Sequence, residues 1–151
     1  MRIRVLGMIV LCVFSAACAR LQIRPSRTIV QAAPIQSAQQ GGSTFDWTAW
    51  SYWECTVNWQ QYCVMDDTLK APSGWQVCKP YYRIASAGKG GPTFSARMNP
   101  DYVTAVYHFY VEGSGKWWDQ WGSHLRVEDV GVKLISAPTT PAQRQAAGCL
   151  P

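Results

Sequence analysis

The sequence predicts an all-β fold: a single small antiparallel β-sandwich or barrel, braced by disulfides and preceded by a signal peptide and a flexible linker. Three observations carry this prediction. Short segments of alternating apolar and polar residues follow one another at the spacing of strands. Clusters of Gly, Pro, Asn and Asp separate these segments, with no ten-residue helical pattern between them. Four cysteines lie in or just after this region, as in small domains that disulfides stabilise.

Six segments have the composition and alternation of strands: 45–57, 59–65, 75–85, 93–98, 102–112 and 125–135. The segment 102–112 carries β-branched and aromatic residues on both faces, which predicts a central strand that is covered on both sides. Pro80 lacks an amide hydrogen, so it places its strand at a sheet edge or splits it in two. A shift in the apolar period predicts a bulge near Asp129 or Gly131.

Residues 1–19 are predicted to be a secretory signal peptide. Two arginines precede a run of ten uncharged residues, which is shorter than the roughly 20 apolar residues that cross a bilayer. Two processing outcomes stay open. Cleavage after Ala19 would release Arg20 as the N-terminus, whereas a lipobox ending at Cys18 would make Cys18 a lipidated first residue. Ser15 stands where lipoproteins usually have leucine. A lipid on Cys18 would be the protein's one attachment to a membrane.

The rest of the chain is predicted to comprise a flexible linker at 20–44, a β domain at 45–136 and a C-terminal tail at 137–151 that is tied by Cys149. The linker is rich in glutamine and small residues and lacks apolar periodicity. Ordering it would therefore bury little surface against a large entropy cost. The tail contains three prolines and is expected to be loose.

The domain's four cysteines are predicted to form two disulfides, which places the protein in an oxidising compartment. Four cysteines allow three connectivities. The order along the chain favours Cys55 with Cys63 and Cys78 with Cys149. Their spacings contain no C-x-x-C pair, so no zinc site, other metal or cofactor is predicted. The expected location is the periplasm, the outer membrane as a lipoprotein, or the extracellular space.

Charge argues against nucleic acid as a partner. The chain carries a formal charge of +5. Residues 45–136, however, include eight basic and nine acidic residues, so the net charge of the domain itself is close to zero. A protein that binds nucleic acid needs a concentrated basic face. The expected partner is instead a carbohydrate or a protein of the cell envelope.

A tryptophan-rich loop between two predicted strands is the strongest candidate for a ligand site. It contains Trp117, Trp118 and Trp121 together with Asp119 and Gln120. Indole rings stack on the apolar face of a sugar, while acid and amide groups bond its hydroxyls. A lectin-like module follows from this pattern. The alternative is that one indole plugs an end of the sandwich. Since adjacent side chains diverge, one of Trp117 and Trp118 is expected inside and one outside.

No enzyme activity is predicted. His108 lies mid-strand and is expected to be a hydrogen-bonded interior residue, and adjacent Ser123 and His124 form no triad. The neighbouring acids Asp66 and Asp67 are interpreted as a turn. Two further functions stay open: an envelope lipoprotein or secreted module that binds or inhibits a protein, and a secreted hydrolase, which would need carboxylates converging in a cleft.

Overall fold

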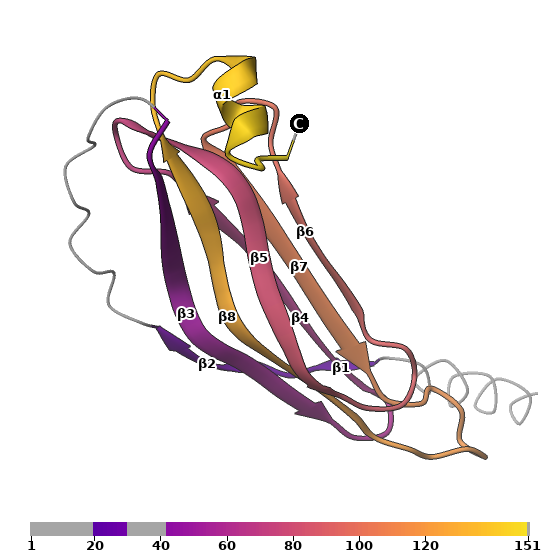
Figure 1. Ribbon diagram of the computed structural model, residues 1–151. Helices are drawn as coiled ribbons and strands as arrows, with labels where there is room; N and C mark the ends of the chain where they lie inside the picture. The colour runs from indigo at the N-terminus through magenta and orange to yellow at the C-terminus, as the bar shows by residue number, and fades with distance from the viewer. Residues whose placement is uncertain (1–19, 30–41, 151) are drawn as a thin grey trace, which may run out of the picture.

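A computed structural model describes residues 20–29 and 42–150 as two four-stranded β-sheets packed face to face (Figure 1). The strand orders are β1-β4-β7-β6 and β2-β3-β8-β5. All pairs are antiparallel except β1 with β4. The elements are β1 (Leu21–Gln22), β2 (Ser26–Ile29), β3 (Thr44–Val57), β4 (Gln61–Lys70), β5 (Trp75–Ala87), β6 (Thr93–Met98), β7 (Thr104–Glu112), β8 (Ser123–Ser136) and α1 (Pro141–Ala146).

The predicted β-rich class and the disulfide bracing are confirmed. In the described part of the chain the sheets do not close into a barrel, which leaves the sandwich of the two predicted forms. Cys55 bonds to Cys63 and Cys78 to Cys149, which is the favoured connectivity. Two disulfides are consistent with an oxidising environment such as the one exported proteins meet. Residues 1–19, which are predicted to be a signal peptide and include Cys18, lie outside the described residues.

The core lies between the sheets and is centred on β7. Alternate residues of this strand are fully buried, and Phe109 stacks on Trp53 of the facing sheet at 5.7 Å between ring centroids. The opposite face of β7 is only half-buried, so the prediction of cover on both sides is wrong. Apolar and aromatic residues on that face misled the prediction, because strands favour them even where one face meets water.

The six predicted strands agree closely with those observed, and only one extends by more than two residues beyond its predicted bounds. β4 continues to Lys70, so Asp66 and Asp67 lie inside a strand rather than in a turn. Pairing with β7 keeps the chain extended there. Pro80 lies in β5, which is unbroken and forms the edge of its sheet. Asp129 has a φ of 53°, and the register with β5 shifts beside it, which confirms the bulge.

Part of the expected linker is ordered as strands. β1 adds to β4 through backbone bonds, including Leu21 N to Gln60 O at 2.9 Å and Ile23 N to Tyr62 O at 2.9 Å. β2 pairs with β3. These short strands are held by backbone hydrogen bonds, which do not depend on the side chains. Their sequence therefore shows no apolar periodicity from which they could be predicted. Residues 30–41 of the expected linker lie outside the described part of the chain.

The expected loose tail contains a helix, α1. Thr140 caps its first turn: Gln143 N donates to Thr140 Oγ1 at 3.2 Å, and Thr140 N donates to Gln143 Oε1 at 2.8 Å. Pro141 follows at the first helical position, where proline is favoured. This capping box is a recognisable signal in the sequence. It was missed because six residues are too few for a helical period.

Two tyrosines that are removed from water, Tyr107 of β7 and Tyr81 of β5, predict a loss of stability at high pH. Burial raises the pKa of Tyr107, whose hydroxyl donates to Gly131 O. Burial also raises the pKa of Tyr81, against a lowering by its hydrogen bond with Thr48. Both folded-state values lie above the ordinary 10.0. The neutral phenols therefore favour the fold fully below about pH 10, and this contribution is lost as the pH rises further.

We expect urea midpoints to be level up to about pH 9 and then to fall, with Tyr107 adding a slope of up to about 1.4 kcal/mol per pH unit. Tyr107→Phe removes the titrating group and should flatten part of this fall, which separates its effect from that of lysines titrating in the same range. An unchanged slope in Tyr107→Phe would contradict the assignment to this tyrosine.

Candidate functional site

The loop between β7 and β8, residues 113–122, is fixed at its base. Gln60 N donates to Ser114 O at 2.9 Å, and Ser114 N donates to Trp121 O at 3.0 Å. Two glycines allow the loop to lie directly against the turn between β3 and β4. A Cβ on Gly113 would stand 2.1 Å from the Asn58 carbonyl oxygen, and one on Gly122 would meet Val57 O at 2.5 Å. The base therefore presents the rest of the loop at a defined position.

The tip of the loop carries two exposed indoles. Trp117 is 72% exposed and Trp118 is 67% exposed. Their rings are nearly perpendicular, at 87°, with centroids 5.6 Å apart. The expectation of one ring inside and one outside is wrong, as is the idea that either plugs the sandwich. Alternation holds for strands, whereas a turn closes here through Asp119 N to Lys116 O at 3.3 Å.

Trp121 has a different role from its two neighbours. It is half-buried, and its indole nitrogen donates to Asp119 Oδ2 at 3.2 Å. Its ring lies over Gly90, where a Cβ would come within 2.3 Å of Trp121 Cη2. Gln120 Nε2 donates to Trp117 O at 3.1 Å. Of the five predicted site residues, Trp121, Asp119 and Gln120 thus shape the loop, while Trp117 and Trp118 project from it.

A pocket of about 420 Å³ opens beside the tip, lined among others by Arg20, Gln60, Glu112, Lys116, Asp119 and Trp121. Arg20 forms an ion pair with Glu112, which also accepts a hydrogen bond from the Tyr110 hydroxyl. Trp59 Nε1 donates to Lys116 O at 3.1 Å and supports the loop from the neighbouring turn. Arg20, Glu112 and Gln60 are not among the predicted site residues, because no local motif joins residues so far apart in the sequence.

Two carboxylates, Glu112 and Asp119, line this pocket, so acid chemistry has to be considered. A glycosidase needs one carboxylic acid that donates a proton and a second carboxylate nearby. Glu112 already accepts from Arg20 and Tyr110, and Asp119 accepts from the Trp121 indole. Both groups therefore act as acceptors. Such acceptors can also bind the hydroxyl groups of a ligand.

The other candidate catalytic residues lie elsewhere. His108 is hydrogen-bonded, with Nδ1 2.7 Å from Asp66 Oδ1, but its side chain is 43% exposed on the outer sheet face, so the predicted interior position is wrong. Ser95 is its register partner on β6. This row of acid, imidazole and hydroxyl lies on an open sheet face. Ser123 is buried and its hydroxyl donates to Lys89 O, while adjacent His124 is exposed.

Within residues 20–29 and 42–150, no cluster of three His, Cys, Asp or Glu side chains is arranged to hold a metal ion. The same residues include no helix with the length and apolar character needed to cross a bilayer. In comparisons with protein-family models, with curated proteins and with solved structures, nothing matches this chain, so the loop and its pocket are interpreted from their own chemistry.

Proposed function

We propose that the protein is an exported, non-catalytic binding module that recognises a carbohydrate, in the manner of a lectin, through the tryptophan loop. One observation carries the proposal. Trp117 and Trp118 project into solvent from a loop whose base is fixed by backbone hydrogen bonds and close glycine contacts. Exposing two adjacent indoles is costly in water, and a partner that covers them recovers that free energy.

The geometry favours a single sugar ring over a flat polysaccharide surface. Because the indoles are perpendicular, one ring offers its face and the other its edge. The Lys116 ammonium lies 6.0 Å from the Trp118 centroid and covers part of that ring. Trp117 is therefore the stacking face. Hydroxyls at the rim of the sugar would then reach Lys116 and Asp119 at the mouth of the pocket.

Trp117→Ala is expected to weaken binding by about 30-fold, which corresponds to about 2 kcal/mol for a central aromatic contact. Pull-down on insoluble peptidoglycan, chitin, cellulose and xylan, followed by titration with the soluble fragments of any positive polymer, measures the change. The melting temperature should be unchanged, because the ring makes little contact with the core. Phe94→Ala is the matched control: Phe94 is 43% exposed but lines neither the loop nor the pocket.

Full binding by a variant lacking both Trp117 and Trp118 would overturn the proposal, and so would failure to bind across the whole panel. Release of soluble sugar from a polymer, abolished by Glu112→Gln, would instead identify a hydrolase. Co-purification of one envelope protein, lost on Trp117→Ala, would identify the loop as a protein-binding surface.

A second candidate partner, a lipid surface, is favoured by the position of Arg20. Arg20 lines the pocket beside the loop, and a Cβ on Gly115 would lie 2.6 Å from Arg20 Nη2. A lipid on Cys18 would join the chain two residues earlier, a reach of about 7 Å. The loop would then meet the interface of the bilayer, where tryptophan is enriched. Co-sedimentation with anionic vesicles, lost on Trp117→Ala without any glycan binding, would select this candidate.

A further inference from the structure

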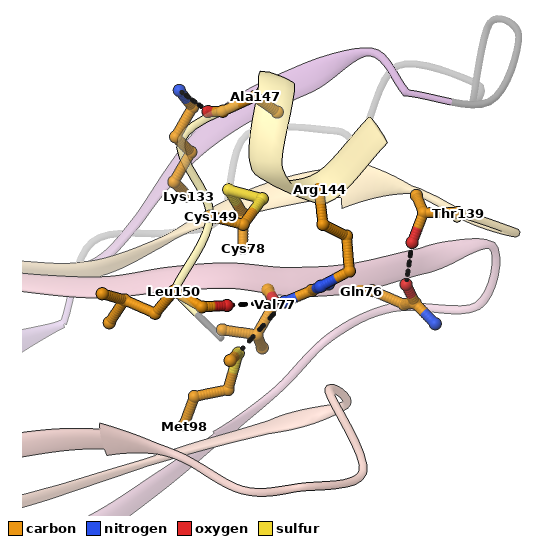
Figure 2. The surroundings of a disulfide bond; sticks show 10 residues. All are labelled: Gln76, Val77, Cys78, Met98, Lys133, Thr139, Arg144, Ala147, Cys149 and Leu150. Atoms are coloured by element: carbon orange, nitrogen blue, oxygen red, sulfur yellow. Dashed lines mark hydrogen bonds between the residues drawn. A yellow bond between two sulfur atoms is a disulfide. The ribbon is translucent and has the colours of Figure 1, made fainter. Parts of the chain in front are cut away.

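A second pocket is lined by residues of α1 and of the segment that follows it. α1 lies at the end of the sandwich opposite the loop between β7 and β8 (Figure 1). The central feature of the pocket is Arg144, whose guanidinium points from the helix into the sheet (Figure 2). Nη2 donates to Val77 O at 3.0 Å and to Leu150 O at 3.4 Å. The guanidinium also stacks on Tyr102, with Cζ 3.9 Å from the ring centroid. These contacts hold the C-terminal segment against β5.

The charge of Arg144 is not balanced by these contacts. The residue is only 8% exposed, and its Nη1 is buried without a hydrogen-bond partner. Three other arginines, Arg20, Arg83 and Arg126, form ion pairs with carboxylates, whereas the partners of Arg144 among the described residues are all neutral. Burial lowers the pKa of its guanidinium, although an arginine remains charged at neutral pH. A buried cation with an unfilled donor favours an anion beside it.

The pocket next to Arg144 has the size and lining for a small organic ligand. Its volume is about 470 Å³. Apolar surface from Tyr102, Pro141 and Leu150 combines with neutral hydrogen-bonding groups and with no acidic side chain. The polar groups are Gln76, Thr139 and Gln145, all of which line the pocket.

We propose that this pocket binds a small organic carboxylate, with Arg144 as its counter-ion and the apolar wall covering the body of the ligand. Carboxylate oxygens match the fork of a guanidinium. One cation and a half-apolar wall suit a singly charged ligand with an apolar body better than inorganic phosphate, which carries more charge and needs more donors. Nη1 itself is buried, so the proposal requires the side chains over it to move, and Leu150 and Gln145 are among the exposed residues of the pocket lining.

Thermal unfolding of the purified chain at pH 7 tests the proposal, with sodium benzoate and sodium hexanoate as probes. Sodium chloride and sodium phosphate at equal ionic strength are the references. A bound carboxylate should raise the melting temperature with the logarithm of its concentration above its Kd, by about 5 °C at ten times the Kd. Arg144→Met should abolish the rise relative to its own baseline. Lys79→Met, which removes an exposed cation of β5 outside the pocket, should keep it.

Gln76→Glu keeps the test decisive if Arg144→Met does not fold. It is nearly isosteric, retains an acceptor for Thr139 Oγ1, and brings a negative charge to the pocket. It should raise the melting temperature without ligand and remove most of the response to benzoate. Trp117→Ala should leave the response intact, since the two pockets are independent.

Three outcomes would overturn the proposal. One is a wild-type protein that responds to neither carboxylate. Another is an equal response to chloride or phosphate, which would show a general anion effect only. The third is an Arg144→Met variant that folds and retains the full response.

Discussion

Removing the disulfide between Cys78 and Cys149 is expected to lower the free energy of unfolding by about 4 kcal/mol, the larger of the two disulfide effects. Its cysteines are 71 residues apart, whereas Cys55 and Cys63 are 8 apart. Cross-linking restricts an unfolded chain more when the closed loop is longer, and the short loop is worth about 2.5 kcal/mol on the same relation. Urea unfolding of the two double-alanine variants measures the difference.

The two variants should also separate the two pockets. Loss of the Cys78–Cys149 bond releases the segment that carries Arg144, so the carboxylate response should disappear while binding at the tryptophan loop persists. The Cys55–Cys63 bond joins β3 to β4 next to the turn under the loop. Its loss should weaken binding at the tryptophan loop and leave the carboxylate response unchanged. Equal stability losses from the two deletions would contradict the loop-length argument.

The strands of the domain could be predicted because each carries its own signal. Alternation in β7, the single Pro80 in β5 and the period shift at Asp129 in β8 are local features, and each matches its place in the sheets. The disulfide pairing followed from order along the chain. The tryptophan loop was recognisable because three indoles between glycines are unusual in a segment that has to lie at the surface.

The composition of the pockets could not be predicted, since it depends on contacts between distant residues. Arg20 meets Glu112 across 92 positions of the sequence, and Arg144 reaches Val77 across 67. β1 is held by backbone bonds, which leave no pattern in the side chains. The outward direction of both Trp117 and Trp118 is set by the turn at the tip, where the alternation of a strand does not apply.

Phe109→Ala is expected to lower the free energy of unfolding by about 4 kcal/mol, as large aromatic-to-alanine changes in a core do. Phe109 is fully buried at the centre of the interface between the sheets. Its ring stacks on Trp53 and meets Tyr82 edge-on at 5.3 Å, so its removal opens a cavity that these rigid aromatic neighbours on the facing sheet cannot easily fill.

Phe94→Ala is the matched control, because Phe94 is the register partner of Phe109 on β6 and makes its own edge contact with Tyr82 at 6.0 Å. Being 43% exposed, Phe94 leaves little cavity when truncated, and a loss of about 1 kcal/mol is expected. Urea unfolding with a common slope for the wild type and both variants gives the comparison. Similar losses at the two positions would mean that Phe109 does not join the sheets. A much larger loss of stability at Phe109 would show that the aromatic contacts between β3, β5 and β7 stabilise the fold. The loop that follows Glu112 would then not be needed for stability and could serve binding.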